Sequence, residues 1–171
     1  ARPSEVAQAK VDVMSHASYL AWEGENEIPA DATARKRKHE HFDPSNPVFL
    51  DLLKSMSGNK TILDATVTVY RAYFPDSALY GYGITLTRLA YQHGVPIGVG
   101  TDIYIEDFDG PAPLFEEMEA LQNEVGMSPI DILLGATLVN ANMIGAAHQI
   151  GSIEVGKKAN LLVLQADPLL D

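Results

Sequence analysis

A histidine and an aspartate in this sequence each come at the end of a short apolar run. His16 ends the run VDVMSH, and Asp102 ends the run VPIGVGTD. Both runs are typical of buried parallel strands, because they are short, contain β-branched residues and are bounded by turn residues. Ligands bind at the carboxyl ends of strands in α/β sheets, and imidazole and carboxylate groups transfer protons in enzymes. Asp102 is therefore a candidate site residue, and His16 lies at the corresponding end of another predicted strand.

Each residue also has a simpler interpretation. A single histidine after an apolar strand is often only hydrogen-bonded within the structure, and an aspartate after a strand often forms an Asx-turn or caps a helix. The pair His39-x-His41 has the spacing of a metal-binding motif, but it follows the charged run ATARKRK and indicates a solvated surface segment. Five aromatic residues could line a pocket or pack in the core: Tyr70, Tyr73, Phe74, Tyr80 and Tyr82.

Composition restricts the class of protein. The 171 residues are 46% hydrophobic and carry a formal net charge of −11, which favours a folded domain and argues against nucleic acid or an anionic membrane as the main partner. There is no cysteine, so the chain has no disulfide, thiolate zinc site or thiol nucleophile, which fits a cytoplasmic location. We find no signal-peptide profile at the start of the sequence and no apolar stretch of membrane-spanning length.

Strands and helices are expected to alternate over the first hundred residues. The expected strands are 11–16, 60–70 and 95–99. Helices are expected between them at 47–56, with Val48 on its apolar face, and at 77–94, which Gly94 would close. This order predicts a parallel sheet with right-handed crossovers.

The pattern changes after Asp102. Residues 113–126 are typical of an amphipathic helix with its acids facing solvent, and residues 128–145 begin with a capping-box-like Ser128 and predict a second helix. The remaining segment, 149–171, alternates like a small β-ribbon, with its strongest strand at Leu161 to Leu164. We therefore expect two parts, residues 1–148 and residues 149–171.

Several segments together resemble one known family. The segments SHASYL, VGTD, PLFEEMEAL, GMSPIDILLGATLVNANMIG and IGSIEVGKKANLLVLQADPL are similar to the C-terminal part of the amidohydrolase superfamily, in its imidazolonepropionase-like and prolidase-like branch. The last segment is the most specific, although Asn160 stands where the family usually has aspartate. The resemblance implies an α/β fold: strands six to eight of a (β/α)8 TIM-type barrel, followed by a β segment of a small β-sandwich.

The resemblance also implies a reaction. Members of this family are metal-dependent hydrolases, and this branch acts on an amide-type C–N bond in a cyclic amide or a dipeptide through a metal-activated water. By position, His16 corresponds to a metal ligand, and Asp102 corresponds to a ligand that also accepts the proton of the water. The metal is expected to be Zn, with Fe or Mn as alternatives. No substrate-binding residue is identified from the sequence.

The resemblance implies that the rest of such a site lies outside this chain. A complete barrel takes roughly 250 residues, and a catalytic metal usually has three protein ligands. We therefore expect a C-terminal fragment of a hydrolase that is inactive alone and that associates with a second copy or with a complementary N-terminal chain. The alternative is a non-catalytic folded fragment that self-associates and lacks a complete metal site.

Overall fold

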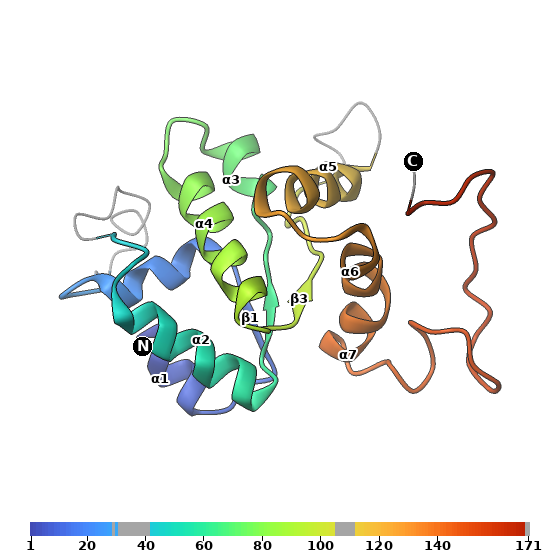
Figure 1. Ribbon diagram of the computed structural model, residues 1–171, viewed down its shortest axis with the longest axis horizontal. Helices are drawn as coiled ribbons and strands as arrows, with labels where there is room; N and C mark the ends of the chain where they lie inside the picture. Colours follow the sequence, from blue (N-terminus) through green and yellow to red (C-terminus); the bar gives the residue numbers. More distant parts are fainter. Residues whose placement is uncertain (29, 31–41, 105–111, 170–171) are drawn as a thin grey trace.

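The computed structural model describes residues 1–28, 30, 42–104 and 112–169, and it is an α/β structure built on a small parallel sheet (Figure 1). The sheet contains β1 (Val13–Ser15), β2 (Ile62–Asp64) and β3 (Ile97–Gly98) in the order β1-β2-β3. Both neighbouring pairs are parallel. The three predicted strands and their parallel arrangement are confirmed, although each strand is shorter than expected.

The register brings the carboxyl ends of the three strands to one edge. Ser15 pairs with Asp64, and Asp64 pairs with Gly98. Backbone hydrogen bonds continue beyond the strands, because the His16 N–H donates to the Asp64 carbonyl at 3.0 Å and the Ala65 N–H donates to the Gly98 carbonyl at 3.4 Å. The segments that follow the strands are thus held side by side.

Helices connect the strands in the predicted order. After α1 (Pro3–Gln8), the crossovers contain α2 (Pro47–Asn59) and α4 (Leu79–Gln92). Asn46 caps α2 by accepting a hydrogen bond from the Val48 N–H at 3.1 Å. Gly94, with φ of +72°, follows α4 as the glycine pattern predicts.

The core lies between the sheet and these helices. Its largest fully buried side chains include Leu63 of β2 and Leu86 of α4, and the buried face of α2 consists of Phe49, Leu52, Leu53 and Met56. Val48 was expected on this face but is 37% exposed. It follows Pro47 in the first turn of the helix, and Phe49 fills the core position in its place.

The predicted strand 60–70 is wrong at both ends. Lys60 is the C-cap of α2 with φ of +59°, so the strand begins only at Ile62. Beyond Asp64 the chain turns and forms α3 (Thr68–Tyr73). The Thr- and Val-rich composition favours a strand, but tertiary contacts stabilise the helix instead.

Glu117 supplies the contacts that start α3. Its carboxylate accepts hydrogen bonds from the N–H groups of Val67 and Thr68, both at 2.9 Å, and from the Thr68 hydroxyl at 2.6 Å. These donors lie at the beginning of α3, where backbone N–H groups have no partner within the helix. Burial raises the pKa of Glu117, and the hydrogen bonds from Thr68 and Val67 oppose that shift. The acid was expected on the solvent face of its helix and is instead fully buried.

The two helical regions after Asp102 form as predicted, each with a π-helical segment. The first consists of α5 (Pro113–Ala120) and η4 (Leu121–Val125). The second consists of α6 (Pro129–Leu134), η5 (Gly135–Val139) and α7 (Asn140–Met143). The Ser128 hydroxyl caps α6 by accepting from the Asp131 N–H at 3.2 Å.

Asn140 attaches the second of these helical regions to the sheet. Its side-chain carbonyl accepts from the Val99 N–H at 3.0 Å, and its amide donates to the Val99 carbonyl at 2.8 Å. The side chain thus satisfies both backbone groups of the residue that follows β3, as a neighbouring strand would. A Cβ on Gly98 would lie 3.0 Å from the same side-chain oxygen, so glycine leaves room for the close approach of Asn140.

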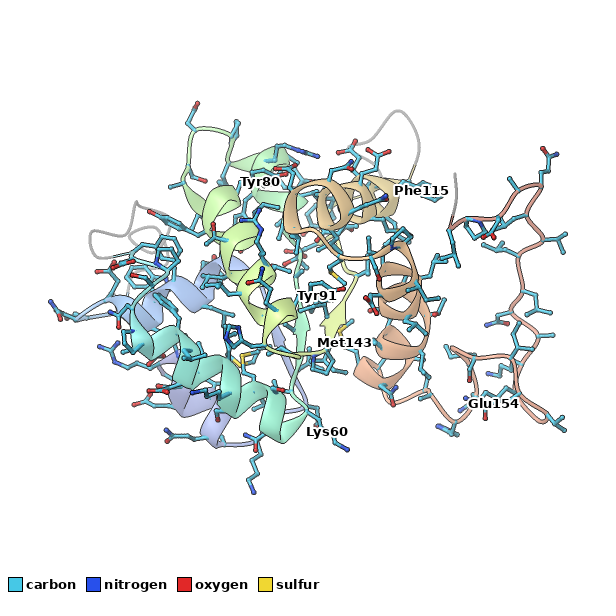
Figure 2. The ribbon with its side chains drawn as sticks, viewed as in Figure 1. Lys60, Tyr80, Tyr91, Phe115, Met143 and Glu154 are labelled. Atoms are coloured by element: carbon cyan, nitrogen blue, oxygen red, sulfur yellow. The ribbon has the colours of Figure 1, made fainter. Side chains whose placement is uncertain are left out.

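The predicted β-ribbon is not formed. Among residues 149–169 the structure contains turns and irregular chain, with no strand. This segment runs on the far side of α6 and α7 from the sheet, and Glu154 marks it in Figure 2. Leu162 and Val163 are 90% and 99% exposed, so the most apolar part of the predicted ribbon has no partner within the described residues. No strand forms here because a strand requires a hydrogen-bonded neighbour. The division of the chain at residue 148 stays a prediction.

Candidate functional site

His16 and Asp102 meet at the carboxyl edge of the sheet. His16 follows β1, Asp102 lies beyond β3, and the distance from His16 Nε2 to Asp102 Oδ2 is 3.7 Å. Their side chains are 30% and 61% exposed, so both are open to solvent. Residues 86 positions apart in the sequence are therefore brought together by the parallel order of the strands.

The backbone is in an unusual conformation after each of the three strands. His16, Thr66 and Asp102 have φ values of +70°, +45° and +53°. Non-glycine residues rarely adopt this left-handed region, and such residues are concentrated at functional sites. The conformation turns the chain sharply at the end of each strand, which directs the following segments away from the sheet.

The imidazole of His16 is held on its inner side by Thr66. The distance from His16 Nδ1 to Thr66 Oγ1 is 2.9 Å, and the threonine is buried. The rings of Tyr19 and Tyr70 approach the imidazole edge-on, with centroid distances of 5.7 Å and 6.2 Å. One ring nitrogen is thus occupied, and the other, Nε2, is directed to Asp102. Sequence reasoning missed Thr66 because it lay within the expected strand 60–70.

Asp64 is a second acid near this edge that sequence reasoning did not identify. Its Oδ2 accepts a hydrogen bond from the Ser15 hydroxyl at 3.0 Å, while its buried Oδ1 has no hydrogen-bond partner among the described residues. Burial raises the pKa of Asp64, and the charge of Asp102 adds to this effect while Ser15 and His16 oppose it. A Cβ on Gly100 would lie 2.3 Å from Asp64 Oδ1, so the absence of a side chain there makes room for the carboxylate.

The segment that carries Asp102 is anchored on both sides of the residue. Ile103 is buried, and the Tyr104 N–H donates to the Tyr73 hydroxyl at 3.2 Å. Of the five aromatic residues considered for a pocket, Tyr70 lies beside His16 and Tyr73 contacts the Asp102 segment. Tyr80 and Tyr82 lie on α4, where Tyr82 is buried. The aromatic residues therefore divide between the site and the packing.

Two of the residues at this edge are of the types that bind metals. Among the residues that the structure describes, there is no group of three or more His, Cys, Asp or Glu side chains placed to hold a metal ion. His16 and Asp102 provide one nitrogen and one oxygen ligand, types that zinc and other first-row metals accept. Two ligands fit a metal only as part of a larger set, because catalytic zinc usually has three protein ligands.

His39 and His41, predicted as a surface segment, lie outside the described residues, so that prediction is not tested. His93, at the C-terminal end of α4, is exposed and places Nδ1 2.8 Å from the Leu89 carbonyl of its own helix. His148 is also exposed and contacts the neighbouring Gln149. Neither of these two histidines contacts the edge where His16 lies.

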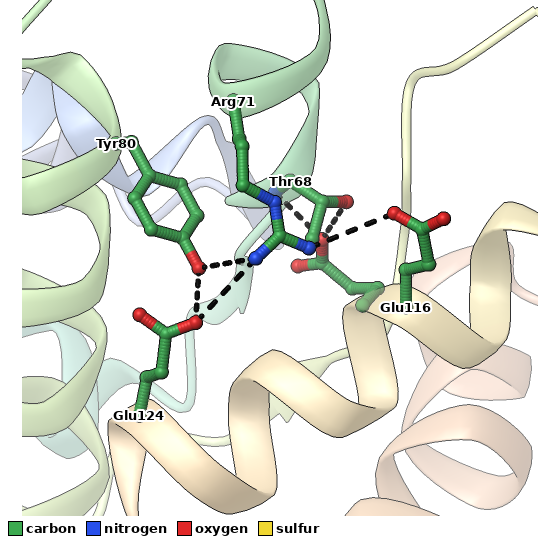
Figure 3. Close-up of polar contacts among 6 residues, drawn as sticks. Thr68, Arg71, Tyr80, Glu116 and Glu124 are labelled. Carbon is green, nitrogen blue, oxygen red and sulfur yellow. Dashed lines mark hydrogen bonds and ion pairs between the residues drawn. The ribbon is translucent and has the colours of Figure 1, made fainter. Parts of the chain in front are cut away.

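A second polar cluster lies between helices and has a structural role. The Arg71 guanidinium of α3 lies 3.6 Å from a carboxylate oxygen of Glu116 on α5 and 3.6 Å from one of Glu124 on η4, and it lies over the ring of Tyr80 on α4 (Figure 3). The Tyr80 hydroxyl also donates to Glu124. Burial and this carboxylate raise the pKa of Tyr80 to about 12. The cluster joins four helical segments through exposed or half-buried charges.

The parallel sheet, with a histidine and an aspartate at its carboxyl edge, defines an α/β protein, and this is the edge where α/β proteins commonly bind ligands. The chain belongs to the Amidohydrolase family, because residues 5–171 match that family. The resemblance noted in the sequence is thereby confirmed. No described helix is both long enough and apolar enough to cross a membrane.

Curated relatives match parts of the chain. An imidazolonepropionase from Thermoplasma acidophilum is 30% identical over 126 residues, which are 74% of this chain and 27% of that protein. An S-triazine hydrolase from Gordonia rubripertincta is 32% identical over 90 residues, which are 48% of this chain and 18% of that protein. The chain thus spans about a quarter or less of the length of these two relatives.

Two solved structures share the fold. The chain is similar to a prolidase-type structure from Bifidobacterium longum, with 25% identity and a TM-score of 0.67, over 99% of this chain and 40% of that one. It is similar also to a Xaa-Pro dipeptidase with bound methionine in its active site, with 20% identity and a TM-score of 0.65, over 99% of this chain and 37% of that one. The second likeness concerns the fold alone.

Proposed function

We propose that this chain is the C-terminal part of a metal-dependent hydrolase that acts on an amide-type C–N bond, in a cyclic amide or a dipeptide. In this proposal β1, β2 and β3 are strands six to eight of a (β/α)8 barrel. The segment 149–171 joins a small β-sandwich when its partner strands are present. We propose also that the protein is cytoplasmic and that it assembles with a second copy or with an N-terminal chain.

The observation that carries the proposal is the convergence of His16 and Asp102. Two side chains of the types used for metal binding and proton transfer lie 3.7 Å apart at the end of the sheet where such sites form. The strained backbone at both residues adds support, because strain of this kind is retained mainly where function requires it.

Each residue has a distinct role in the proposal. His16 would bind the metal through Nε2, because its Nδ1 is engaged with Thr66. Asp102 would bind through one carboxylate oxygen and accept the proton of the attacking water, which it would later give to the leaving nitrogen. The metal, when bound, would supply Lewis acidity that activates the water and polarises the carbonyl. Zinc suits these ligands, as do iron and manganese.

The names of the relatives support the bond type. An imidazolonepropionase and an S-triazine hydrolase are among the curated relatives, and a prolidase-type structure shares the fold at 25% identity. These names support a small cyclic amide or a dipeptide as the substrate class. The alternative is a folded, non-catalytic fragment that self-associates, and it is favoured by the presence of only two candidate ligands in the described part of the chain.

The test requires the enzyme rebuilt with the sequence that precedes this chain in its gene. We expect Asp102→Asn to lower turnover of a cyclic amide or dipeptide by about 10²–10⁴-fold, because the variant keeps the shape of the side chain but cannot accept the proton. We expect His16→Ala to weaken metal retention, so that excess metal partly restores its activity.

His39→Ala and His41→Ala are the matched controls, because we interpret both as surface residues. Each control is expected to keep its activity and its metal content. Activity within about twofold of the wild type in Asp102→Asn, together with inactive His39 and His41 variants, would contradict the proposal and place the site elsewhere. Loss of folding is monitored by circular dichroism in every variant.

A further inference from the structure

We propose that Thr66 is a positioning residue that holds the His16 imidazole with Nδ1 turned inward and Nε2 turned toward Asp102, and that its hydroxyl does so in either neutral tautomer of the ring. The reason for positioning the ring, which is metal binding by His16, rests on the proposed function, but the hydrogen bond itself can be tested without metal. Thr66 follows the C-terminal end of β2. This strand lies between β1 and β3, which precede His16 and Asp102.

The contact is short and protected. Thr66 Oγ1 lies 2.9 Å from His16 Nδ1, and Thr66 is 2% exposed. Little water can therefore compete for this hydroxyl, and a hydrogen bond in such surroundings is costly to lose. The surrounding rings of Tyr19 and Tyr70 limit rotation of the imidazole, so the hydroxyl decides which nitrogen points inward.

The backbone at Thr66 places the hydroxyl. Its φ of +45° is unfavourable for a β-branched residue, and it follows the end of β2 by two positions. The next two residues, Val67 and Thr68, are fixed by hydrogen bonds to Glu117. Thr66 is thus held between a strand and a capped helix, and these contacts stabilise a conformation that the residue would not adopt alone.

A hydroxyl suits this position because it can both donate and accept. In the Nε2–H tautomer, whose proton would be on the side of Asp102, the Thr66 hydroxyl donates to Nδ1. In the Nδ1–H tautomer, which would leave Nε2 free for a cation, Nδ1–H would donate to Thr66 Oγ1. The ring would keep the same orientation and the same charge in both tautomers.

The first measurement uses the metal-free chain at about pH 8.5, where imidazoles are neutral. The nitrogen resonances of His16 are recorded by NMR in the wild type, Thr66→Ser and Thr66→Val. We expect Nδ1 to resonate as a hydrogen-bonded acceptor in the wild type and in Thr66→Ser. In Thr66→Val we expect the signal to move to the position of an unbonded nitrogen, because valine has the shape of threonine without the hydroxyl.

Thr61→Val is the matched control. Thr61 is a buried threonine beside the start of β2 whose hydroxyl donates to the Val11 carbonyl at 2.9 Å, far from His16 along the strand. The Thr61→Val substitution removes one buried hydrogen bond but should leave the nitrogen signals of His16 unchanged. An unchanged Nδ1 signal in Thr66→Val would overturn the proposal, as would an equal change in Thr61→Val.

A second measurement adds Zn²⁺ to the same variants. We expect Thr66→Val to weaken Zn²⁺ binding about 10–100-fold, the usual effect of losing the partner of a ligating histidine, and Thr66→Ser to bind like the wild type. Equal Zn²⁺ affinity in the valine variant would contradict the positioning role. If Zn²⁺ leaves His16 unaffected in the wild type while the metal-free result holds, the proposed metal site fails and the hydrogen bond stands.

Discussion

At the scale of single residues, Asp64 and Gly100 are in close contact near the candidate site. A Cβ on Gly100 would lie 2.3 Å from Asp64 Oδ1, and the other oxygen of that carboxylate is held by Ser15. We expect Gly100→Ala to lower the free energy of unfolding by about 1–3 kcal/mol through overpacking. The measurement is urea unfolding followed by circular dichroism.

The double variant shows whether this contact is the cause. If the clash is with the carboxylate, Asp64→Ala should remove most of the cost of Gly100→Ala, giving a favourable coupling in the double-mutant cycle. Additive effects of the two substitutions on the free energy of unfolding would show that Gly100→Ala is destabilising for another reason. Gly58→Ala serves as the control, because a Cβ there meets no atom within 4 Å.

The two candidate ligands could be found from the sequence, whereas the residues that support them could not. His16 and Asp102 end short apolar runs, and the order of strands alone predicts that such ends share an edge. Thr66 and Asp64 lie inside a Thr- and Val-rich stretch that looks like one continuous strand. No local pattern indicates that the chain turns there, because the turn depends on contacts with distant residues.

At the scale of elements, α3 exists because a distant acid caps it. Glu117 of α5 accepts three hydrogen bonds from Val67 and Thr68, which lie 50 and 49 positions earlier in the sequence. The composition of residues 60–70 favours a strand, and the contact with Glu117 provides a physical reason for a helix that begins at Thr68. The expected solvent-facing position of Glu117 was wrong for the same reason, since its partners are not visible in the local sequence.

We expect Glu117→Gln to lower the free energy of unfolding by about 1–3 kcal/mol, because the amide replaces one acceptor oxygen with a donor that faces other donors. Glu116→Gln is the control, since Glu116 is half-exposed and its ion pair with Arg71 should contribute about 1 kcal/mol or less. Both values come from urea unfolding. A larger loss in Glu116→Gln than in Glu117→Gln would contradict the proposed cap.

The strand order and the helices other than α3 were largely predictable, and the tail was not. Apolar spacing and terminal residues such as Ser128 indicate helices through local chemistry, and the structure contains them. The alternation in residues 149–171 indicates a capacity to form strands, but a strand forms only beside a partner. The described residues offer none, and the same alternation therefore appears as exposed irregular chain.

At the scale of the whole molecule, exposed apolar side chains in the tail favour association. Ile153 and Val155 are almost fully exposed, like Leu162 and Val163, and isolated strand-forming segments of this kind tend to pair. We expect the chain to self-associate at tens of micromolar in sedimentation experiments. A clean monomer under these conditions would contradict this expectation.

A pair of double variants tests whether the tail is responsible. Leu162→Ser with Val163→Ser should reduce self-association without lowering the free energy of unfolding, because these side chains make few contacts within the chain. Asn160→Ser with Gln165→Ser changes exposed polar residues of the same segment and should leave association unchanged. Equal association in both double variants would assign the contact to another surface.

We propose that His16 and Asp102 form one metal-binding edge, and a Zn²⁺ titration of the chain followed by histidine nitrogen NMR will show whether they do. We predict that the His16 ring signals change first, and that Asp102→Asn suppresses this change while Asp51→Asn, an exposed acid on α2, does not. Zn²⁺ that shifts the signals of His39 and His41 and leaves His16 unaffected would contradict the claim.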